Sequence, residues 1–189
     1  RLVGSEMCIR DRHRRTDIQL LTLPESERKL EASRKKMLNE ADVVFLCLPD
    51  DAACEAALWV ENPDTVVLDT STAHRTAPGW CYGFPELSPV QEARLRQAKR
   101  IAVPGCHASG FIALVYPLVS AGLLTPDALL SCYSLTGYSG GGKKMIAEYR
   151  APERSFLLNA PRQYALGQTH KHLKEMKAVT GLANEPVFC

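Results

Sequence analysis

Residues 42–69 read DVVFLCLPDDAACEAALWVENPDTVVLD, and this stretch decides the fold. Its first seven residues are almost all apolar or β-branched, which is typical of a strand buried on both faces. Residues 52–60 then show a helical pattern, with Asp50 or Asp51 as a candidate helix cap. An Asn-Pro-Asp turn leads into a second apolar strand at 65–69. A strand, a helix and another strand in this order predict a parallel sheet.

The same alternation continues on both sides of this stretch. Residues 18–23 (IQLLTL) predict a further strand, and residues 27–39 a charged helix. Residues 70–90 contain too many prolines and glycines for a regular element. A short helix at 91–99 and a strand at 100–103 follow, so we expect an α/β protein.

Composition excludes several classes of protein. With 189 residues and 46% hydrophobic content, the chain can form one or two domains. The net charge is +2 and the basic residues are scattered, so we expect no nucleic-acid partner. The longest apolar stretch, 111–124, is too short to cross a bilayer, and the chain opens with charged residues instead of a signal peptide. We therefore expect no membrane association and a cytoplasmic location.

The cysteines and histidines do not have metal-ligand spacing. The seven cysteines form no CxxC pair and no even-numbered framework, which indicates reduced thiols. His170 and His172 are two residues apart with no cysteine pair near them in the sequence, so no metal site is expected.

One cysteine stands at a chemically favourable place. Residues 103–110 read VPGCHASG, so the strand at 100–103 stops at a Pro-Gly turn just before Cys106. Helix-spaced apolar residues begin at Ala108 and continue to Ala121, which places Cys106 at a helix N-terminus. Unpaired backbone amides there favour a thiolate, and the small neighbours leave room for a substrate carbonyl. The alternative is a buried cysteine that only packs.

Two later segments carry candidate binding groups. Residues 129–136 predict a strand, and it runs into GYSGGGKK at 137–144. The glycines could present backbone amides and the lysines positive charge to a phosphate or carboxylate; the alternative is a flexible hairpin loop. Residues 163–176, QYALGQTHKHLKEM, place two histidines just before or at the start of a helix. They are acid/base candidates or ordinary histidines, and Glu175 either orients one of them or is solvated.

Together, VPGCHASG, GYSGGGKK and YALGQTHKHLKE resemble motifs of the N-acetyl-gamma-glutamyl-phosphate reductase family, in its shorter subfamily. Residues 43–53 and 67–86 are also similar to that family, so the resemblance covers approximately residues 16–180. It implies a Rossmann-type parallel-sheet domain followed by an α+β catalytic and oligomerisation domain.

The resemblance also implies an activity. It is the NADPH-dependent reduction of N-acetyl-glutamyl phosphate, a small acyl-phosphate substrate, to the semialdehyde in arginine biosynthesis, by an enzyme that forms homo-oligomers. Cys106 would be the nucleophile that forms a thioester and expels phosphate, and His170 the acid/base group. The substrate would be surrounded by Tyr164, His172, Glu175 and Ser139. The NADP site would be formed by Leu48, Pro49, Ser71, Thr72, Ser139 and Gly140.

A separate reading of the residues concerns the cofactor's 2′-phosphate. Arg28 and Lys29 follow the expected strand at 18–23, where a Rossmann fold selects that phosphate. A solvated helix start explains them equally well.

The chain departs from the family at both ends. Residues 1–15 offer neither an apolar strand nor a glycine-rich turn, so we expect residues 1–12 to be a non-native start and the first βα unit to be missing. Residues 13–126 would then form the NADP-binding domain, ending in the cysteine helix, and residues 127–189 a truncated catalytic and dimerisation domain. Two single residues also differ: Lys174 stands where proline is common, and His107 where an aromatic residue is frequent.

Three other functions compete with this one. Aspartate-semialdehyde dehydrogenase uses similar cysteine and histidine chemistry. A cysteine hydrolase or acyltransferase would pass the thioester to water or an amine and would need no nicotinamide. The third alternative is an inactive binding module.

Overall fold

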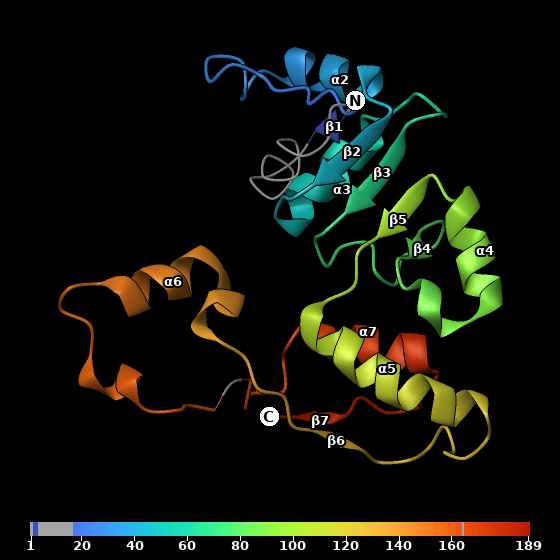
Figure 1. The fold of residues 1–189 in the computed structure, drawn as a ribbon, viewed down its shortest axis with the longest axis vertical. Coiled ribbons are helices and arrows are strands. Elements are labelled where there is room, and N and C mark those ends of the chain that lie inside the picture. Colours follow the sequence, from blue (N-terminus) through green and yellow to red (C-terminus); the bar gives the residue numbers. More distant parts are fainter. Residues whose placement is uncertain (1, 4–16, 164) are drawn as a thin grey trace.

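The computed structural model describes residues 2–3, 17–163 and 165–189 of the chain. Within this part, a parallel sheet of five strands has the order β1-β2-β3-β5-β4 (Figure 1). Its central strands pair in register, with Val44 opposite Val67 and Leu68 opposite Ile101. The strands are β1 (Leu2–Val3), β2 (Val43–Leu46), β3 (Val66–Asp69), β4 (Cys81–Tyr82) and β5 (Arg100–Ala102).

The helices between these strands are α2 (Glu31–Glu40), α3 (Asp50–Leu58) and α4 (Pro89–Gln97). Val44, Leu46 and Val67 are buried on one side of β2 and β3, which explains the apolar sequence of these strands. They share a core with Leu38 of α2 and Ala56 of α3. Burial of these side chains fixes the sheet and its helices as one α/β unit.

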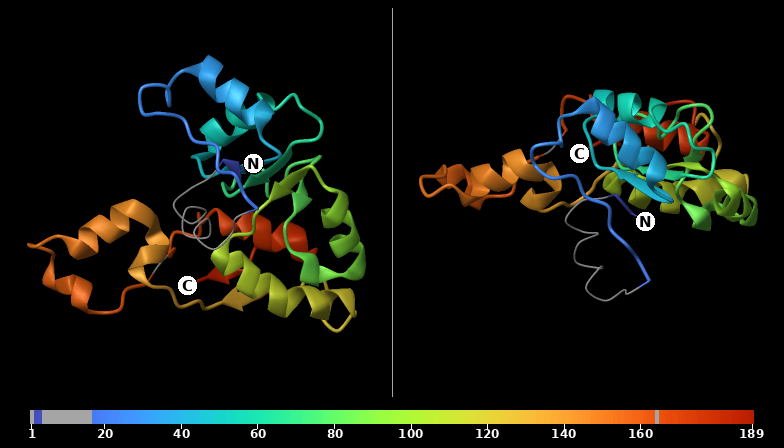
Figure 2. Two further views of the ribbon diagram at one scale, coloured as in Figure 1. Left: turned by 45° about the horizontal axis from the view of Figure 1, so that its top comes forward. Right: turned by 90° about the horizontal axis from the view of Figure 1, so that it is seen from above.

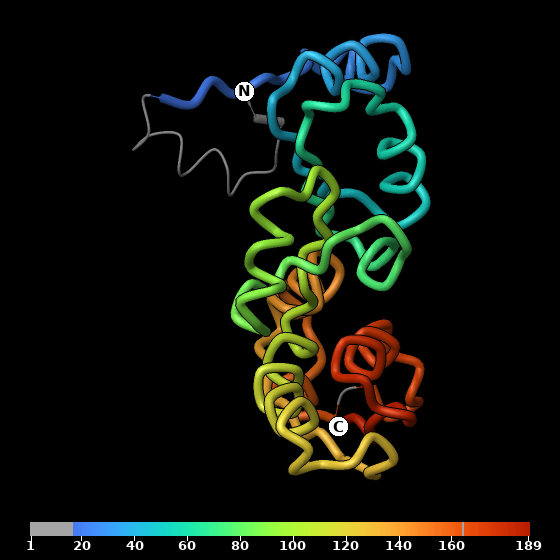
Figure 3. The backbone as a smooth tube through the Cα atoms, turned by 90° about the vertical axis from the view of Figure 1, so that its right-hand side faces the viewer, coloured from blue at the N-terminus to red at the C-terminus, as the bar shows by residue number. Residues whose placement is uncertain are grey.

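The second half of the chain packs around two helices, α5 (Cys106–Ser120) and α7 (His172–Thr180). Ile112, Leu173, Met176 and Phe188 are almost completely buried in their shared core. Below them, β6 (Ser131–Cys132) and β7 (Val187–Phe188) form a parallel pair. In Figure 3 this half, yellow to red, lies beneath the α/β half, and β5 continues directly into α5 between them.

An arm extends from the second half (Figure 2). It contains η2 (Tyr138–Gly141), α6 (Gly142–Arg150) and η3 (Phe156–Asn159). The Tyr138 and Tyr149 rings stack with their centroids 4.9 Å apart, and the Arg162 guanidinium lies 5.4 Å from the Tyr149 centroid. These contacts hold the base of the arm together.

The α/β prediction is confirmed, and several element boundaries are corrected. The strand expected at 18–23 does not form, since only Leu20 makes a strand-type bridge and Leu21 packs on the core of the α/β half. An extended segment of this kind satisfies the apolar pattern by packing instead of pairing. The helix expected from residue 27 begins at Glu31, after a turn at 25–29.

The region expected to lack regular structure, 70–90, contains β4 and the 3-10 helix η1 (Pro85–Leu87). Proline and glycine shorten the elements here without preventing β4 from pairing with β5. Conversely, the strand expected at 129–136 is reduced to β6, because its long apolar side chains Leu129, Tyr133 and Leu135 are exposed and do not form a core face.

The glycine run is not a hairpin loop. Gly142 has φ of 72°, a backbone conformation that glycine adopts easily, and the chain turns there from η2 into α6. Neither Asp50 nor Asp51 caps α3, whose N-cap is Pro49; both lie in the first turn. Residues 1–12 lie mostly outside the described residues, but Leu2–Val3 pairs with β2, so the expectation of no strand there is wrong.

Of the helices in the described ranges, none combines the length and the apolar character needed to cross a bilayer.

Candidate active site

Cys106 is the first residue of α5, as the strand-turn-helix pattern predicted. β5 ends at Ala102, Gly105 is the N-cap of the helix, and the Ser109 amide donates to the Gly105 carbonyl at 2.8 Å. The Cys106 side chain is exposed, so the alternative of a buried packing cysteine does not apply. Its position places the sulfur beside the positive end of the helix dipole and the first-turn amides.

A cavity of about 470 Å³ opens beside Cys106. Four distant parts of the chain line it: the loop after β3, the start of α5, the arm, and the segment that leads into α7. It therefore brings the three sequence motifs together at one place. The lining residues are Thr72, Cys106, His107, Thr136, Gly140, Gly141, Met145, Ala165, Thr169, His170, Lys171 and His172.

Two imidazoles of this cavity, His170 and His172, are the candidate acid/base groups. His170 precedes α7 and His172 is its first residue; their ring centroids are 4.5 Å apart. Burial lowers the pKa of His170, and the charges of His107 and Arg75 lower it further. Burial and the same neighbours, together with His170, lower the pKa of His172 to about 4. Both rings are therefore neutral at pH 7, the form that accepts a proton.

Glu175 is neither solvated nor a histidine partner, which corrects both sequence alternatives. Its side chain is 2% exposed and accepts three hydrogen bonds: from Arg75 at 2.9 Å, from the Tyr82 hydroxyl at 2.7 Å and from the Gly105 amide at 2.8 Å. Burial and the Glu175 carboxylate raise the pKa of Tyr82. Glu175 thus ties α7 to β4 and to the turn before Cys106.

Gly105 is required by a close approach of side chains. A Cβ atom at this position would lie well inside 3.0 Å of both the His172 ring and the Arg75 guanidinium. Arg75 cannot withdraw easily, because it also donates to the Val103 carbonyl at 3.0 Å. Only glycine lets these groups meet directly beneath Cys106.

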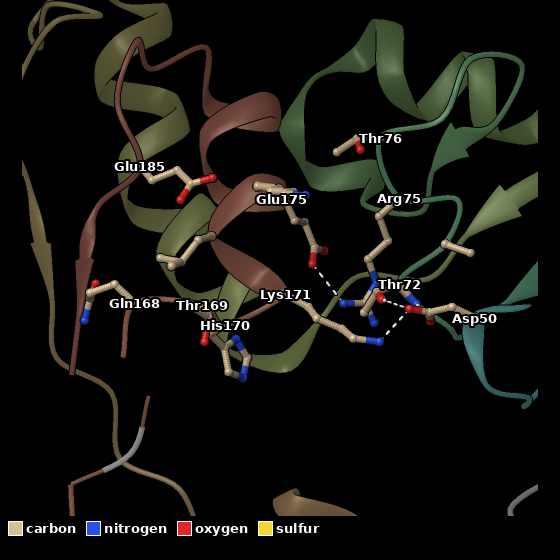
Figure 4. A pocket seen from close by; sticks show the side chains of 13 residues that line it. Asp50, Thr72, Arg75, Thr76, Gln168, Thr169, His170, Lys171, Glu175 and Glu185 are labelled. Atoms are coloured by element: carbon tan, nitrogen blue, oxygen red, sulfur yellow. Dashed lines mark hydrogen bonds and ion pairs between the residues drawn. The ribbon is translucent and has the colours of Figure 1, made fainter. Parts of the chain in front are cut away.

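A second cavity, of about 460 Å³, is lined by His170 and Lys171 together with Asp50, Arg75 and Glu175 (Figure 4). Thr72, Thr169, His170 and Lys171 line both cavities and so form the wall between them. Asp50 clamps this wall: its carboxylate accepts from the Thr72 amide at 3.0 Å, from the Thr72 hydroxyl at 2.7 Å and from Lys171. Hydrogen bonds from Lys171 and Thr72 lower the pKa of Asp50 to about 2.

The remaining predicted site residues have weaker connections to the two cavities. Leu48 packs against the α/β core and Pro49 caps α3. The Ser71 hydroxyl donates to Asp69 at 2.6 Å. Several others do not line either cavity: Ser139, which belongs to η2 next to Gly140, and the exposed Arg28 and Lys29 in the turn before α2. Tyr164 lies outside the described residues.

Sequence reasoning missed four residues that organise the site: Asp50, Arg75, Tyr82 and Lys171. Asp50 was noticed only as a candidate cap, and Lys171 only as the residue between two histidines. Arg75 and Tyr82 belong to a breaker-rich segment and reach Glu175 across 100 and 93 residues. No local pattern marks such a contact.

The fold and this site define a class of protein. In parallel α/β sheets, ligands bind outside the carboxyl ends of the strands, and a nucleotide domain places its dinucleotide there. Thr72 and Asp50 follow the carboxyl ends of β3 and β2, and the cavity that Thr72 borders is also lined by an exposed cysteine and three histidines. This arrangement is that of a Rossmann-type domain joined to a second domain that completes the cavity.

The chain belongs to the semialdehyde dehydrogenase family. Residues 10–95 match the family's NAD binding domain, and residues 106–188 match its dimerisation domain. The α/β half is therefore the nicotinamide-nucleotide domain of this family, and the second half is its dimerisation domain.

Curated relatives point to one branch of the family. The chain is 46% identical over 176 residues to N-acetyl-gamma-glutamyl-phosphate reductase 2 of Pseudomonas putida, covering 92% of this chain and 55% of that protein. It is 47% identical to N-acetyl-gamma-glutamyl-phosphate reductase of Chelativorans sp., covering 92% and 56%. The chain thus spans a little over half the length of these relatives.

Among solved structures, aspartate semialdehyde dehydrogenase II from Vibrio cholerae matches with a TM-score of 0.62. The match covers 99% of this chain and 67% of that one at 16% identity. The enzyme from Francisella tularensis matches with a TM-score of 0.52, at 11% identity, covering 82% and 54%. These structures share the fold of this chain.

Proposed function

We propose that this chain is part of an NADPH-dependent reductase that converts N-acetyl-glutamyl phosphate to N-acetyl-glutamate semialdehyde, with release of phosphate. One observation carries the proposal most directly: the exposed Cys106 at the start of α5 shares a cavity with His170 and His172. The relatives that are 43% to 47% identical and bear this reductase name supply the substrate class.

The first chemical step belongs to Cys106. A neutral His170 accepts the thiol proton, and the sulfur attacks the acyl carbon of the substrate. Attack places a negative charge on the oxygen bonded to that carbon, and the backbone amides at the start of α5 would stabilise it. Each donor of this kind typically contributes about 10²–10³ in rate. The bond from the acyl carbon to the phosphate oxygen then breaks, phosphate departs with the electron pair, and a thioester remains on Cys106.

The residues present fit a nicotinamide nucleotide. Its crevice would be formed by Leu48, Pro49, Ser71 and Thr72, which follow the carboxyl ends of β2 and β3, and by Gly140 of the arm, which lines the Cys106 cavity together with Thr72. When bound, NADPH supplies the hydride that reduces the thioester to the aldehyde and frees the Cys106 thiolate. Arg28 and Lys29 remain candidates for the 2′-phosphate, and Ser139, His172 and Tyr164 for substrate contacts.

Assembly and location follow as part of the same proposal. The family's dimerisation domain at residues 106–188 supports a homo-oligomer. The described cysteines, Cys106 among them, are free thiols, which suits a reducing cytoplasm. The reaction would serve arginine biosynthesis.

The decisive experiment separates thioester formation from reduction. The protein is incubated with N-acetyl-glutamyl phosphate without NADPH, and its intact mass is measured. We expect one added N-acetyl-glutamyl group on Cys106, absent from Cys106→Ser, and its discharge as the aldehyde when NADPH is added. Cys54→Ser, which changes an exposed thiol outside the cavity, is the matched control and should still be acylated.

Other results would identify the competing functions. A thioester that disappears in water as fast without NADPH as with it indicates a hydrolase. Faster reaction with aspartyl phosphate indicates an aspartate-semialdehyde dehydrogenase. The absence of any mass increase in folded protein contradicts the nucleophile assignment.

A further inference from the structure

A third imidazole, that of His107, completes a cluster beside Cys106. His107 is the second residue of α5, whereas His172 is the first residue of α7 and His170 lies just before it. The ring centroid of His107 lies 5.8 Å from that of His170 and 5.8 Å from that of His172. Within residues 2–3, 17–163 and 165–189, no group of histidine, cysteine or carboxylate side chains is arranged to hold a metal ion, so the cluster needs another explanation.

The structure holds the His107 ring in place from two sides. Its Nδ1 lies 2.7 Å from the Ser134 hydroxyl, which follows β6. Its edge meets the buried ring of Phe188 in β7, with centroids 5.1 Å apart. A ring anchored in this way cannot easily turn away from His170 when either of them becomes charged.

The groups named around this cluster are mostly positive or basic. His170, which precedes α7, and His172, its first residue, face His107, and Lys171 lies between them in the sequence. Cys106 is the neighbour of His107 on α5, and Arg75 acts on both other histidines from the loop after β3. Two carboxylates that line a cavity with His170 are already paired, Glu175 with Arg75 and Asp50 with Lys171. A proton on one imidazole therefore opposes a proton on the next.

We propose that His107 is a positioning residue that keeps His170 unprotonated, ready to accept the proton of the Cys106 thiol. This role rests on the reaction proposed above, but its physical basis is independent of any substrate. Burial lowers the pKa of His107 itself, and His107 is among the causes that lower the pKa of His170. A phenyl ring would fill the same space without this electrostatic effect, so the identity of the residue matters beyond its volume.

The test is the titration of His170, followed by NMR of histidine labelled at the ring carbon Cε1. The His170 signal is assigned by its loss in His170→Asn. Two variants are compared with the parent: His107→Phe keeps an aromatic ring, and His107→Asn keeps a polar group that can reach Ser134. In both we expect the midpoint of His170 to move to higher pH by about half a unit or more.

The catalytic consequence provides a second readout. The acid limb of the pH profile of kcat/KM should move to higher pH by the same amount. A His170 midpoint that stays at the parent's value in the folded variants would overturn the proposal and leave His107 with a packing role. If one variant fails to fold, the other decides.

Failure of the proposed reaction would look different. If the protein shows no reductase activity but the His170 midpoint still moves, the histidine coupling stands and the assigned reaction does not. If the reaction proceeds and the His170 midpoint does not move, the assigned reaction stands and the coupling between His107 and His170 does not.

Discussion

The Glu175 carboxylate accepts a hydrogen bond from the amide of Gly105, the residue directly before Cys106, at 2.8 Å. Because the same carboxylate also binds Arg75 and Tyr82, one buried charge fixes the turn that presents the thiol. The geometry of the turn before Cys106 therefore depends on a residue 70 positions after Gly105 in the sequence.

Removal of the Glu175 charge should destabilise the fold strongly. In Glu175→Ala the Arg75 guanidinium, 8% exposed, is left without its partner carboxylate. Loss of one partner of a buried ion pair costs about 3–5 kcal/mol, which is measurable by urea unfolding. The matched control is Glu92→Ala, whose ion pair with Arg96 is on the surface and should cost less than about 1 kcal/mol. Equal losses in the two variants would show that Glu175 has no special structural role.

Gly105→Ala tests the close approach beneath Cys106. The new methyl group would overlap the His172 ring and the Arg75 guanidinium, so we expect a loss of about 1–3 kcal/mol in unfolding free energy. Labelling of Cys106 by iodoacetamide, followed by peptide mass spectrometry, should also change in rate. Gly110→Ala is the control: it lies in α5 with nothing within 4 Å of the added Cβ, and should stabilise the helix by about 0.5–1 kcal/mol. A neutral Gly105→Ala would mean that His172 and Arg75 can move apart without cost.

Substitutions of His170 and His172 should differ in their effect on turnover. His170 lines both cavities, whereas His172 is 9% exposed, and its Nδ1 is buried without a hydrogen bond among the described residues. We expect His170→Asn to lower kcat by about 10²–10⁴, the usual contribution of a general acid/base group, and His172→Asn to lower it less. Steady-state rates of NADPH oxidation measure both. The opposite ranking would transfer the proton-transfer role to His172.

How far the sequence predicts this site depends on the distance between the interacting residues. Cys106 could be placed at a helix start because the strand, the Pro-Gly turn and the helical pattern are all within about twenty residues. The roles of Glu175, Arg75 and Tyr82 could not be found, since their contacts join segments 93 to 100 residues apart. Residues 18–23 show the converse error: an apolar pattern indicates burial, and Leu21 is partly buried by packing on the core without forming a strand.

The bonds of the Asp50 carboxylate to Lys171 and Thr72 predict a loss of stability at acidic pH. The folded-state pKa of Asp50, about 2, is below its ordinary value of 3.8. Its contribution to stability is therefore present above about pH 4 and is lost as the pH falls toward 2. Lys171 is 66% exposed, so screening by solvent reduces the contribution to about 1 kcal/mol. A double-mutant cycle of Asp50→Asn and Lys171→Met, measured by urea unfolding at pH 7 and at pH 3, should show a smaller coupling at pH 3, which lies between the two pKa values of Asp50. The same coupling at both would contradict the assigned ionisation.

His172 acts in the same direction as Asp50 but over a higher pH range. Its pKa in the folded protein, about 4, is below the ordinary value of 6.5. The unfolded chain binds this proton first, so stability is full above about pH 6.5 and falls as the pH decreases toward 4. The loss due to this ring is on the order of 3 kcal/mol, and His107 and His170 act in the same direction because their pKa values are also lowered. In His172→Gln, unfolding free energies measured between pH 7 and 4.5 should therefore decline less steeply than in the parent. The measured quantity is the slope of the unfolding free energy with pH, so any constant loss caused by the substitution itself cancels. Equal slopes would show that His172 is protonated as readily in the folded protein as in the unfolded chain.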